Sequence, residues 1–351
     1  MQPDEVMHWL KEEDEQTLEV LWKKADETRR EYVGNDIHLR GIIEISNYCV
    51  RLCHYCGINA ANKNIKRYLM TVEEIMNGVK EIESYGYGTV VLQAGEDARI
   101  KADWIAEIIK RIKNETSLSV TLSLGERKKS ELELWKKSGA DRYLLKIETG
   151  NQRLFKSIHP TASKFEWSNR IQILFFLLET GYETGSGIMV GIPGQTYNDI
   201  LTDIFLFKKL GVHMLGIGPF LPHPETSLGK EFFEGLEDKD QVPNTELMTY
   251  KVNALTRIIC KNINIPTTTA LATINSKTGR ELGLKRGANV IMPNFTPIKY
   301  RQFYEIYPGR ICLEEFGTKV NNMIHERIKS VDREIGYGPG SAIQNKAQKC
   351  I

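Results

Sequence analysis

The 351-residue sequence has almost no net charge, few cysteines and no long hydrophobic run. Its 47 basic and 45 acidic residues nearly cancel, so no sequence-wide field attracts nucleic acid or an anionic membrane. The most apolar stretch, residues 171–178, is far too short to span a bilayer, and residues 1–24 are acidic and amphipathic, unlike a cleavable leader. We therefore expect a cytoplasmic protein with a small-molecule partner, and neither a nucleic-acid nor a membrane partner.

The six cysteines are unevenly distributed along the chain. Cys260, Cys312 and Cys350 are scattered without a pairing pattern, which fits a reducing compartment better than a disulfide framework. The remaining three lie within eight residues, directly after an apolar, strand-like run. A group this dense indicates a metal site.

The grouped cysteines, Cys49, Cys53 and Cys56, form a Cys-x3-Cys-x2-Cys pattern. A structural zinc site normally closes with four nitrogen or sulfur ligands, so three thiolates leave it incomplete. Three thiolates on a 4Fe-4S cube instead leave one iron open to a small molecule, which favours chemistry over structure. We expect His54, between two ligands, to point away from the metal, and structural zinc remains the alternative.

This spacing, with the aromatic Tyr55 just before the last cysteine, resembles the signature of the radical S-adenosylmethionine enzymes. The resemblance implies one 4Fe-4S cluster whose open iron chelates the amino and carboxylate groups of S-adenosylmethionine. It also implies one-electron cleavage of that cofactor to a 5′-deoxyadenosyl radical, with flavodoxin or ferredoxin as the reductant. An exposed cluster would be oxygen-sensitive, so we expect an anaerobic cytoplasm.

Eight short apolar runs alternate with helical stretches, after a helical opening that ends near Val33. The alternation predicts βαβ units, and eight units predict an α/β fold closed into a (β/α)8 TIM-type barrel. Polar and glycine residues follow most of the runs, as expected where a barrel active site forms; an open doubly wound sheet is the alternative. The predicted strands are residues 39–45, 89–93, 120–124, 143–147, 184–190, 214–220, 266–271 and 289–292. The predicted organisation is an N-terminal helical extension (1–35), the barrel (36–330) and a C-terminal tail (331–351).

Several strand ends carry residues suited to holding S-adenosylmethionine along its length. Ala94, Gly95 and Glu96 resemble the family's Gly-Gly-Glu element after strand two, with alanine in place of the first glycine. Glu148, after strand four, can accept hydrogen bonds from the ribose or the amino group, and Arg170 offers a fork of donors to a carboxylate. A solvated pair on the barrel loops is the alternative for these two. The other expected cofactor contacts are Tyr55, Ser123 and, in a glycine-rich stretch that resembles the adenine-packing element, Met189 and Gly191.

Longer segments, spread over residues 28–315, resemble the FeFe-hydrogenase maturases of the HydE family. They are residues 67–68, 91–97, 121–126, 139–145, 181–185, 216–220, 222–224, 288–294 and 300–302. The resemblance implies an enzyme of hydrogenase H-cluster assembly, in which the adenosyl radical acts at the sulfur of an iron precursor bearing carbon monoxide, cyanide and cysteine. Other hydrogenase maturases would then be partners.

The predicted substrate residues combine cations and hydroxyl groups. Arg142 and Lys146 lie at i and i+4 on strand four and therefore face the same side. If that side is the barrel interior, they are buried cations that await an anion. The alternative is that Arg142 pairs with Asp141 at the surface and that the tyrosines fill the core. The hydroxyl donors, implied by the same resemblance, are Thr268, Thr269, Tyr304 and Tyr307.

Two departures from the family leave the substrate open. Some maturases hold an auxiliary cluster near the C-terminus, whereas here only Cys312 stands in that region, followed by Val320 and Met323; we predict no second cluster. Ile147 occupies a position where some relatives have histidine. A paralogue resembling methylornithine synthase or biotin synthase, acting on an amino-acid-derived substrate, is the nearest rival, and a non-catalytic iron–sulfur scaffold is the rival from another class.

Overall fold

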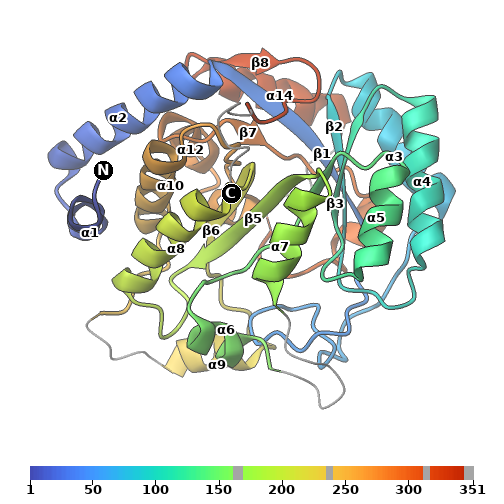
Figure 1. Ribbon diagram of the computed structural model, residues 1–351, viewed down its shortest axis with the longest axis horizontal. Helices are drawn as coiled ribbons and strands as arrows, with labels where there is room; N and C mark the ends of the chain where they lie inside the picture. The colour runs from blue at the N-terminus through green and yellow to red at the C-terminus, as the bar shows by residue number, and fades with distance from the viewer. Residues whose placement is uncertain (161–168, 235–239, 311–316, 344–351) are drawn as a thin grey trace.

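The computed structural model describes residues 1–160, 169–234, 240–310 and 317–343, in which helices alternate with parallel strands (Figure 1). The strands are β1 (Asp36–Ser46), β2 (Thr89–Ala94), β3 (Ser119–Ser123), β4 (Arg142–Leu144), β5 (Glu183–Val190), β6 (Met214–Pro219), β7 (Val290–Ile291) and β8 (Glu334–Gly336). The helices up to β6 are α1 (Pro3–Lys11), α2 (Glu15–Val33), α3 (Val72–Ser84), α4 (Ala102–Glu115), α5 (Lys129–Lys137), α6 (Gln152–Ile158), α7 (Arg170–Glu179) and α8 (Tyr197–Leu210). Those after β6 are α9 (Ser227–Glu234), α10 (Glu246–Cys260), α11 (Thr269–Ile274), α12 (Gly279–Lys285), α13 (Ile298–Arg301) and α14 (Gly317–Lys329).

The strands form a nearly closed parallel barrel, which confirms the predicted fold class. Their order is β6-β5-β4-β3-β2-β1-β7, and all pairs are parallel. Two isolated bridges, Met214 with Asn264 and Pro266 with Val290, join β6 to β7 through the intervening segment. The carboxyl ends of the strands therefore meet around one mouth, as barrel enzymes require.

The predicted seventh strand, residues 266–271, is wrong. Only the bridges at Asn264 and Pro266 remain there, and the chain enters α11 at Thr269. Pro266 has no backbone N–H to give to a ladder. The side chain of Thr268 accepts a hydrogen bond from the Leu271 amide, which begins a helix instead of continuing a strand.

Inward and outward strand positions differ in burial. Outward residues such as Ile43 and Leu122 are completely buried under the surrounding helices. Alternate residues inside the barrel stay partly exposed, because the interior is open towards the carboxyl ends of the strands. These partly exposed inward residues are Ile42, Gln93, Ser123, Leu144, Lys146 and Met189.

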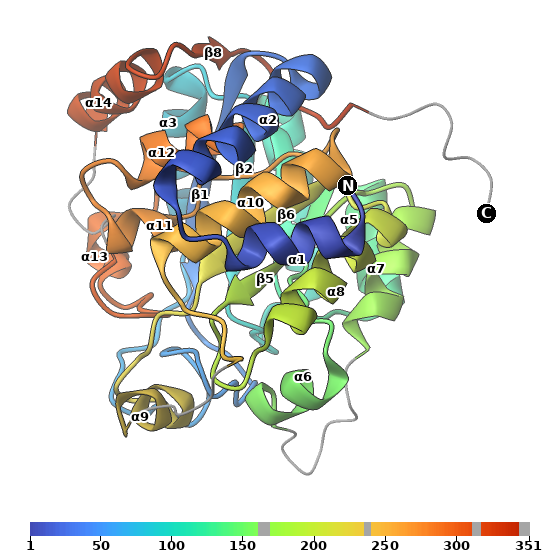
Figure 2. The ribbon, with the colours of Figure 1, turned by 90° about the vertical axis from the view of Figure 1, so that its left-hand side faces the viewer.

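The N-terminal extension packs along one side of the barrel. Figure 2 shows α1 and α2 beside α10, which both contact, and α1 also contacts α8. The expected face of α2, formed by Leu18, Leu21, Trp22 and Ala25, is buried. Among the described helices, none combines the length and apolar character that crossing a bilayer demands.

Part of the predicted C-terminal tail is joined to the barrel. Residues 334–336 form β8, which pairs in parallel with the first residues of β1 (Asp36–His38). After it, residues 339–342 contact the amino end of the barrel through Arg40, Thr89, Arg142 and Asn264. The predicted C-terminal tail (331–351) therefore includes one short strand in its described part. Cys312 and Cys350 lie outside the described residues.

Candidate active site at the carboxyl end of the barrel

The three grouped cysteines lie on a long loop between β1 and α3. The loop is folded around Arg67, whose guanidinium donates to the carbonyls of Asn47, Ile58, Asn59 and Asn62 at 2.6–3.0 Å. Four backbone carbonyls on one fixed fork of donors hold the loop in a single shape. The sequence singled out Arg67 only through the family resemblance and did not indicate this role.

Cys49, Cys53 and Cys56 are free thiols on this loop, Cys53 being buried and the other two partly buried. Burial raises the pKa of all three, that of Cys53 to about 12, and their charges interact with one another. Three neighbouring buried thiols become stable thiolates only with a compensating positive charge, which the irons of a cluster supply. No group of three His, Cys, Asp or Glu side chains in the described ranges is arranged to hold a single metal ion.

Tyr55 anchors the same loop to α6. Its hydroxyl lies 3.0 Å from Nε2 of His159, whose Nδ1 is 3.0 Å from the Phe155 carbonyl. Burial lowers the pKa of His159 well below its ordinary value, so the imidazole is neutral. Backbone hydrogen bonds tie His54 to Ile158 and Leu228 on opposite sides.

A chain of alternating charges links the cysteine loop to the ends of β2 and β3 and to α7. Arg51, between the first two cysteines, contacts Glu96 Oε1 at 2.7 Å and Glu126 Oε2 at 3.0 Å. Glu126 Oε1 is in turn 2.9 Å from Nε of Arg170, and its amide donates to Glu96 Oε2 at 3.0 Å. The sequence predicted Glu96 and Arg170 but assigned no role to Arg51 or Glu126, because their partners come from different strand ends.

Gly95 and Gly191 are glycines for steric reasons. A Cβ at Gly95 would collide with the Tyr48 carbonyl and would lie 3.0 Å from Cys49 Cβ, so only glycine lets β2 end against the cysteine loop. Gly191 has a φ of 82°, and its amide donates to Gln195 Oε1 at 2.7 Å. Both positions bring bare backbone to the mouth of the barrel.

Tyr55 and Met189, both predicted cofactor contacts, pack against one small apolar group. It is separate from the main core and consists of Leu154, Ile158, Ile192, Phe220 and Leu228. An apolar surface beside a thiol-bearing loop suits the flat adenine ring of a nucleoside cofactor. The assignment of Met189 to the cofactor stays a prediction.

Glu148 lies just after β4 and is directed to the cysteine loop. Its carboxylate is buried, with 8% of the residue exposed, and Oε2 is 3.0 Å from Nζ of Lys146. Its charge interacts with Cys53, Cys56 and Tyr55. Arg170 also donates to the Lys146 carbonyl at 2.7 Å, so both predicted cofactor residues brace the end of β4. They are not a solvated surface pair.

The upper interior holds some of the predicted substrate residues. Tyr304 is buried, and its hydroxyl is 3.4 Å from Gln93 Nε2. A Cβ at Gly218 would lie 3.0 Å from Thr268 Oγ1, so this hydroxyl reaches β6. Thr269 is the first residue of α11, and the Tyr307 ring centroid lies 5.9 Å from the Arg310 guanidinium.

Sequence reasoning missed a buried acidic site in the same region. Glu44 is fully buried on β1, where Oε1 lies 2.5 Å from Arg310 NH2 and Oε2 accepts from Asn294 Nδ2 at 3.1 Å. A charged residue within an apolar strand was the available signal. Glu44 and Arg310 compensate each other's burial.

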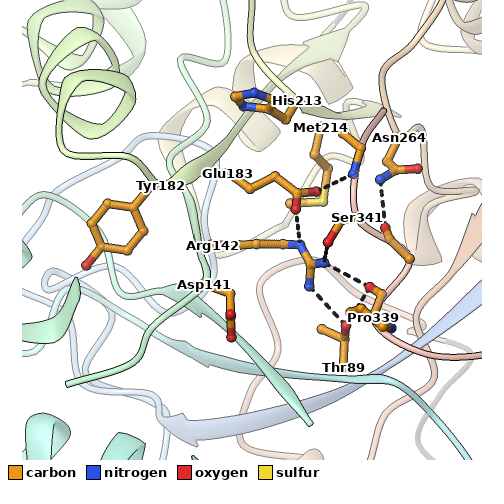
Figure 3. Close-up of polar contacts among 12 residues, drawn as sticks. Thr89, Asp141, Arg142, Tyr182, Glu183, His213, Met214, Asn264, Pro339 and Ser341 are labelled. Atoms are coloured by element: carbon orange, nitrogen blue, oxygen red, sulfur yellow. Dashed lines mark hydrogen bonds and ion pairs between the residues drawn. The ribbon is translucent and has the colours of Figure 1, made fainter. Parts of the chain in front are cut away.

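The prediction for Arg142 is wrong. Arg142 does face the barrel interior, but at its amino end, where its anion is already present (Figure 3). Its Nε lies 2.9 Å from Glu183 Oε2, and its other nitrogens donate to Thr89 Oγ1, the Pro339 carbonyl and Ser341 Oγ at 2.9–3.0 Å. Four residues of strand span about 13 Å, so Lys146 shares the face of Arg142 but not its end of the barrel. The surface pairing with Asp141 is also not observed, because Asp141 pairs with Lys113.

One wall of the interior is lined by glycine. Gly185, Gly187, Gly216 and Gly218 occupy inward positions on β5 and β6, and Gly187 pairs directly with Gly216. A Cβ added to Gly216 would find no atom closer than 3.9 Å. The wall therefore leaves room inside the barrel beside Lys146 and Thr268.

A three-cysteine loop above the mouth of a parallel barrel, with a charged clamp on its strand ends, defines the radical S-adenosylmethionine enzymes. The family model described as Radical SAM superfamily matches residues 43–207, and the chain belongs to this superfamily. It is 46% identical over 318 residues to the [FeFe] hydrogenase maturase subunit HydE of Thermotoga maritima, covering 91% of this chain and 87% of that protein. The radical enzyme class and its 4Fe-4S cluster and S-adenosylmethionine follow from this membership.

More distant relatives share the same fold. The 3-methylornithine synthase of Methanosarcina acetivorans is 29% identical over 290 residues, which is 82% of this chain and 78% of that protein. The crystal structure of methylornithine synthase (PylB) superposes with a TM-score of 0.79 at 21% identity, over 95% of this chain and 94% of that one. The maturase HydG from Carboxydothermus hydrogenoformans gives 0.75 at 20% identity, over 94% and 75%. These structures show the fold alone.

Proposed function

We propose that this enzyme acts in FeFe-hydrogenase H-cluster assembly, on an iron precursor that bears carbon monoxide, cyanide and cysteine. The observation that carries the proposal is the 46% identity to the maturase HydE over 91% of the chain. The glycine-lined interior beside Lys146 and Thr268 supports it, since a compact anionic complex needs space, a cation and hydroxyl donors.

Cys49, Cys53 and Cys56 would hold the cluster, since they are the three neighbouring free thiols on one loop. When bound there, the cluster would supply the electron, received from an external reductant, for reductive cleavage of S-adenosylmethionine. Glu148 and Arg170 would orient the cofactor at its amino, ribose and carboxylate groups, and Tyr55 and Met189 would pack on its adenine. The barrel would confine the radical beside its substrate, because a primary carbon radical attacks almost any nearby C–H bond.

We also propose that flavodoxin or ferredoxin reduces the cluster, that other maturases receive the product, and that the enzyme works in an anaerobic cytoplasm. One cluster per chain is expected, with no auxiliary cluster, because the triad is the only close group of cysteines in the sequence. Ser123, Thr269 and Tyr307 are proposed as further cofactor or substrate contacts, by the family resemblance.

The first test is anaerobic reconstitution with iron and sulfide, followed by S-adenosylmethionine and a strong reductant. About four irons per chain and 5′-deoxyadenosine formation are expected, and Cys53→Ala should lose both. Zinc in place of iron, or a cluster that never cleaves the cofactor, would contradict the enzymatic role and favour the scaffold.

The second candidate is a radical enzyme that acts on an amino acid, favoured by the 29% identity to 3-methylornithine synthase. The two functions differ in what the enzyme consumes. Supplying the iron precursor or an amino acid mixture to the reconstituted enzyme, and measuring which one raises cofactor cleavage, separates them.

A further inference from the structure

Glu148 adopts an unusual backbone conformation. Its φ is 63°, and among the described residues Asp332 is the only other non-glycine residue whose φ lies in the left-handed region. Such a conformation in a side-chain-bearing residue persists only when its surroundings impose it, and it is typical of functional sites. Contacts with neighbouring elements must therefore hold the turn formed by residues 148–151 in this conformation.

Helix α8 supplies that support through two aspartates one turn apart. Asp203 Oδ1 accepts the Gly150 amide at 2.6 Å, and Asp199 Oδ1 accepts Asn151 Nδ2 at 2.8 Å. Asn151 in turn caps α6 through the amides of Arg153 and Leu154. The turn after β4 is thus fastened to α8 at two successive residues.

The contact between Asp203 and Gly150 is close enough to require glycine at position 150. A Cβ at Gly150 would lie 2.6 Å from Asp203 Oδ1 and 2.9 Å from Leu206 Cδ2, so the approach depends on glycine. Asp203 is completely buried, and in the described ranges no cation pairs with it. Its Oδ1 accepts the Gly150 amide and the Thr149 hydroxyl of the same turn lowers its pKa, whereas its Oδ2 has no hydrogen-bond partner among the described residues.

A buried carboxyl without a cation is costly for a protein to keep. Burial raises the pKa of Asp203 to about 8, while the Gly150 amide and the Thr149 hydroxyl oppose that rise. A residue that served only to pack α8 on the barrel would be better replaced by an apolar one. The cost is explained if the turn that carries Glu148 needs this acceptor.

We propose that Asp203 is a positioning residue, which acts through the Gly150 amide to hold the 148–150 turn so that the Glu148 carboxylate faces the cysteine loop and binds S-adenosylmethionine. The inference rests on the proposed cofactor role of Glu148. Loss of the acceptor would let the turn relax to an ordinary φ, which would swing the carboxylate away from Lys146 and the cofactor.

The test compares reconstituted wild type with Asp203→Ala, Asp203→Asn and Glu148→Gln. S-adenosylmethionine affinity is measured by calorimetry, and hydrogen exchange is followed at residues 148–151. Asp203→Ala should weaken binding at least tenfold and speed exchange of the Gly150 amide. Asp203→Asn keeps an acceptor oxygen and should bind within about threefold of wild type, which separates hydrogen bonding from charge.

Leu255→Ala serves as the matched control for general destabilisation. Leu255 is completely buried on α10, which packs against α8, so its truncation leaves a cavity in the core. This variant should lower the melting temperature while leaving cofactor affinity and Gly150 exchange unchanged.

Gly150→Ala examines the same contact from the other side, and it keeps the test possible if Asp203→Ala does not fold. The new methyl group should push the turn away and weaken cofactor binding. In the double variant with Asp203→Ala, Gly150→Ala should weaken cofactor binding less than it does alone, because the Asp203 oxygen that the methyl group would meet is absent. Strictly additive effects would contradict a shared contact.

Two negative outcomes are distinguishable. If Glu148→Gln weakens binding but Asp203→Ala binds as wild type does, Asp203 is not a positioning residue and the role of Glu148 stands. If neither variant changes the affinity of an enzyme that binds the cofactor, the proposed role of Glu148 fails, and the inference fails with it.

Discussion

Arg142 Nε lies 2.9 Å from Glu183 Oε2, and this buried ion pair fastens the C-terminal segment to the amino end of the barrel. Arg142 donates to the Pro339 carbonyl, and Glu183 Oε1 accepts from the Ala342 amide at 2.9 Å. Arg142 and Glu183 therefore each contact the other side chain and the C-terminal segment. The pair closes the end of the barrel opposite the cysteine loop.

Removing Arg142 should cost stability and leave cofactor chemistry intact. Arg142→Ala removes the cation nearest to the largely buried Glu183 together with the hydrogen bonds to Pro339 and Ser341, so the free energy of unfolding should fall by about 3 kcal/mol. Urea unfolding of the variant measures this. Lys80→Ala, which breaks the exposed pair with Glu115, is the control and should change stability by less than about 1 kcal/mol. If Arg142→Ala had normal stability but no longer consumed its substrate, the original prediction that Arg142 binds the substrate would be supported.

Arg170→Lys should weaken the cofactor clamp. A lysine ammonium cannot keep both the Glu126 contact and the Lys146 carbonyl contact, which Arg170 makes with two nitrogens of one planar group. We expect S-adenosylmethionine to bind about tenfold more weakly, equivalent to about 1.4 kcal/mol, as measured by calorimetry on the reconstituted enzyme. Arg153→Lys, on the exposed face of α6, should bind normally. Equal affinities of wild type and Arg170→Lys would exclude Arg170 from the clamp.

The glycine wall should tolerate a methyl group at one position and not at its neighbour. Gly187→Ala would drive its Cβ into the Gly216 carbonyl, and it should lower the free energy of unfolding by about 1–3 kcal/mol. Gly216→Ala points into open space, so its stability should stay within about 0.5 kcal/mol of wild type.

Gly216→Ala also tests the substrate space. It should bind S-adenosylmethionine normally but turn over the iron precursor more slowly, because the methyl group occupies the interior beside Lys146. Chemical unfolding and turnover, measured on both glycine variants, check the two expectations. Normal turnover by Gly216→Ala would place the substrate away from this wall.

Asp203 should make stability depend on pH. Burial raises its pKa from 3.8 to about 8 in the folded chain, so between these values the folded state binds more protons than the unfolded state. Stability contributed by this group is therefore complete below about pH 4 and falls as pH rises towards 8, by up to about 1.4 kcal/mol per pH unit. Asp203→Asn should lose this slope. Melting temperatures of both proteins from pH 4.5 to 8.5 check it, and parallel curves would show that Asp203 is ionised throughout.

The sequence by itself determined the cysteine triad, the radical enzyme class and seven of the eight predicted strands, because each depends on local pattern. Ligand spacing within eight residues and runs of apolar residues are properties of short segments. Pro266 and the Thr268 cap show where this fails, since a proline and a helix start interrupted a run that looked apolar enough for a strand. The prediction that Arg142 and Lys146 point to the same side of the sheet was correct although β4 is short, because side chains on a strand alternate with a period of two.

Only the tertiary structure decided which end of the barrel each residue occupies and which partners meet there. Arg142 finds Glu183 and a segment almost 200 residues away, Glu126 joins Arg51 to Arg170, and Asp203 reaches Gly150 from another helix. These contacts depend on the register of strands and on loops that converge from distant parts of the chain. Pairing across such separations is fixed by the packing of the whole barrel, and no short pattern encodes it.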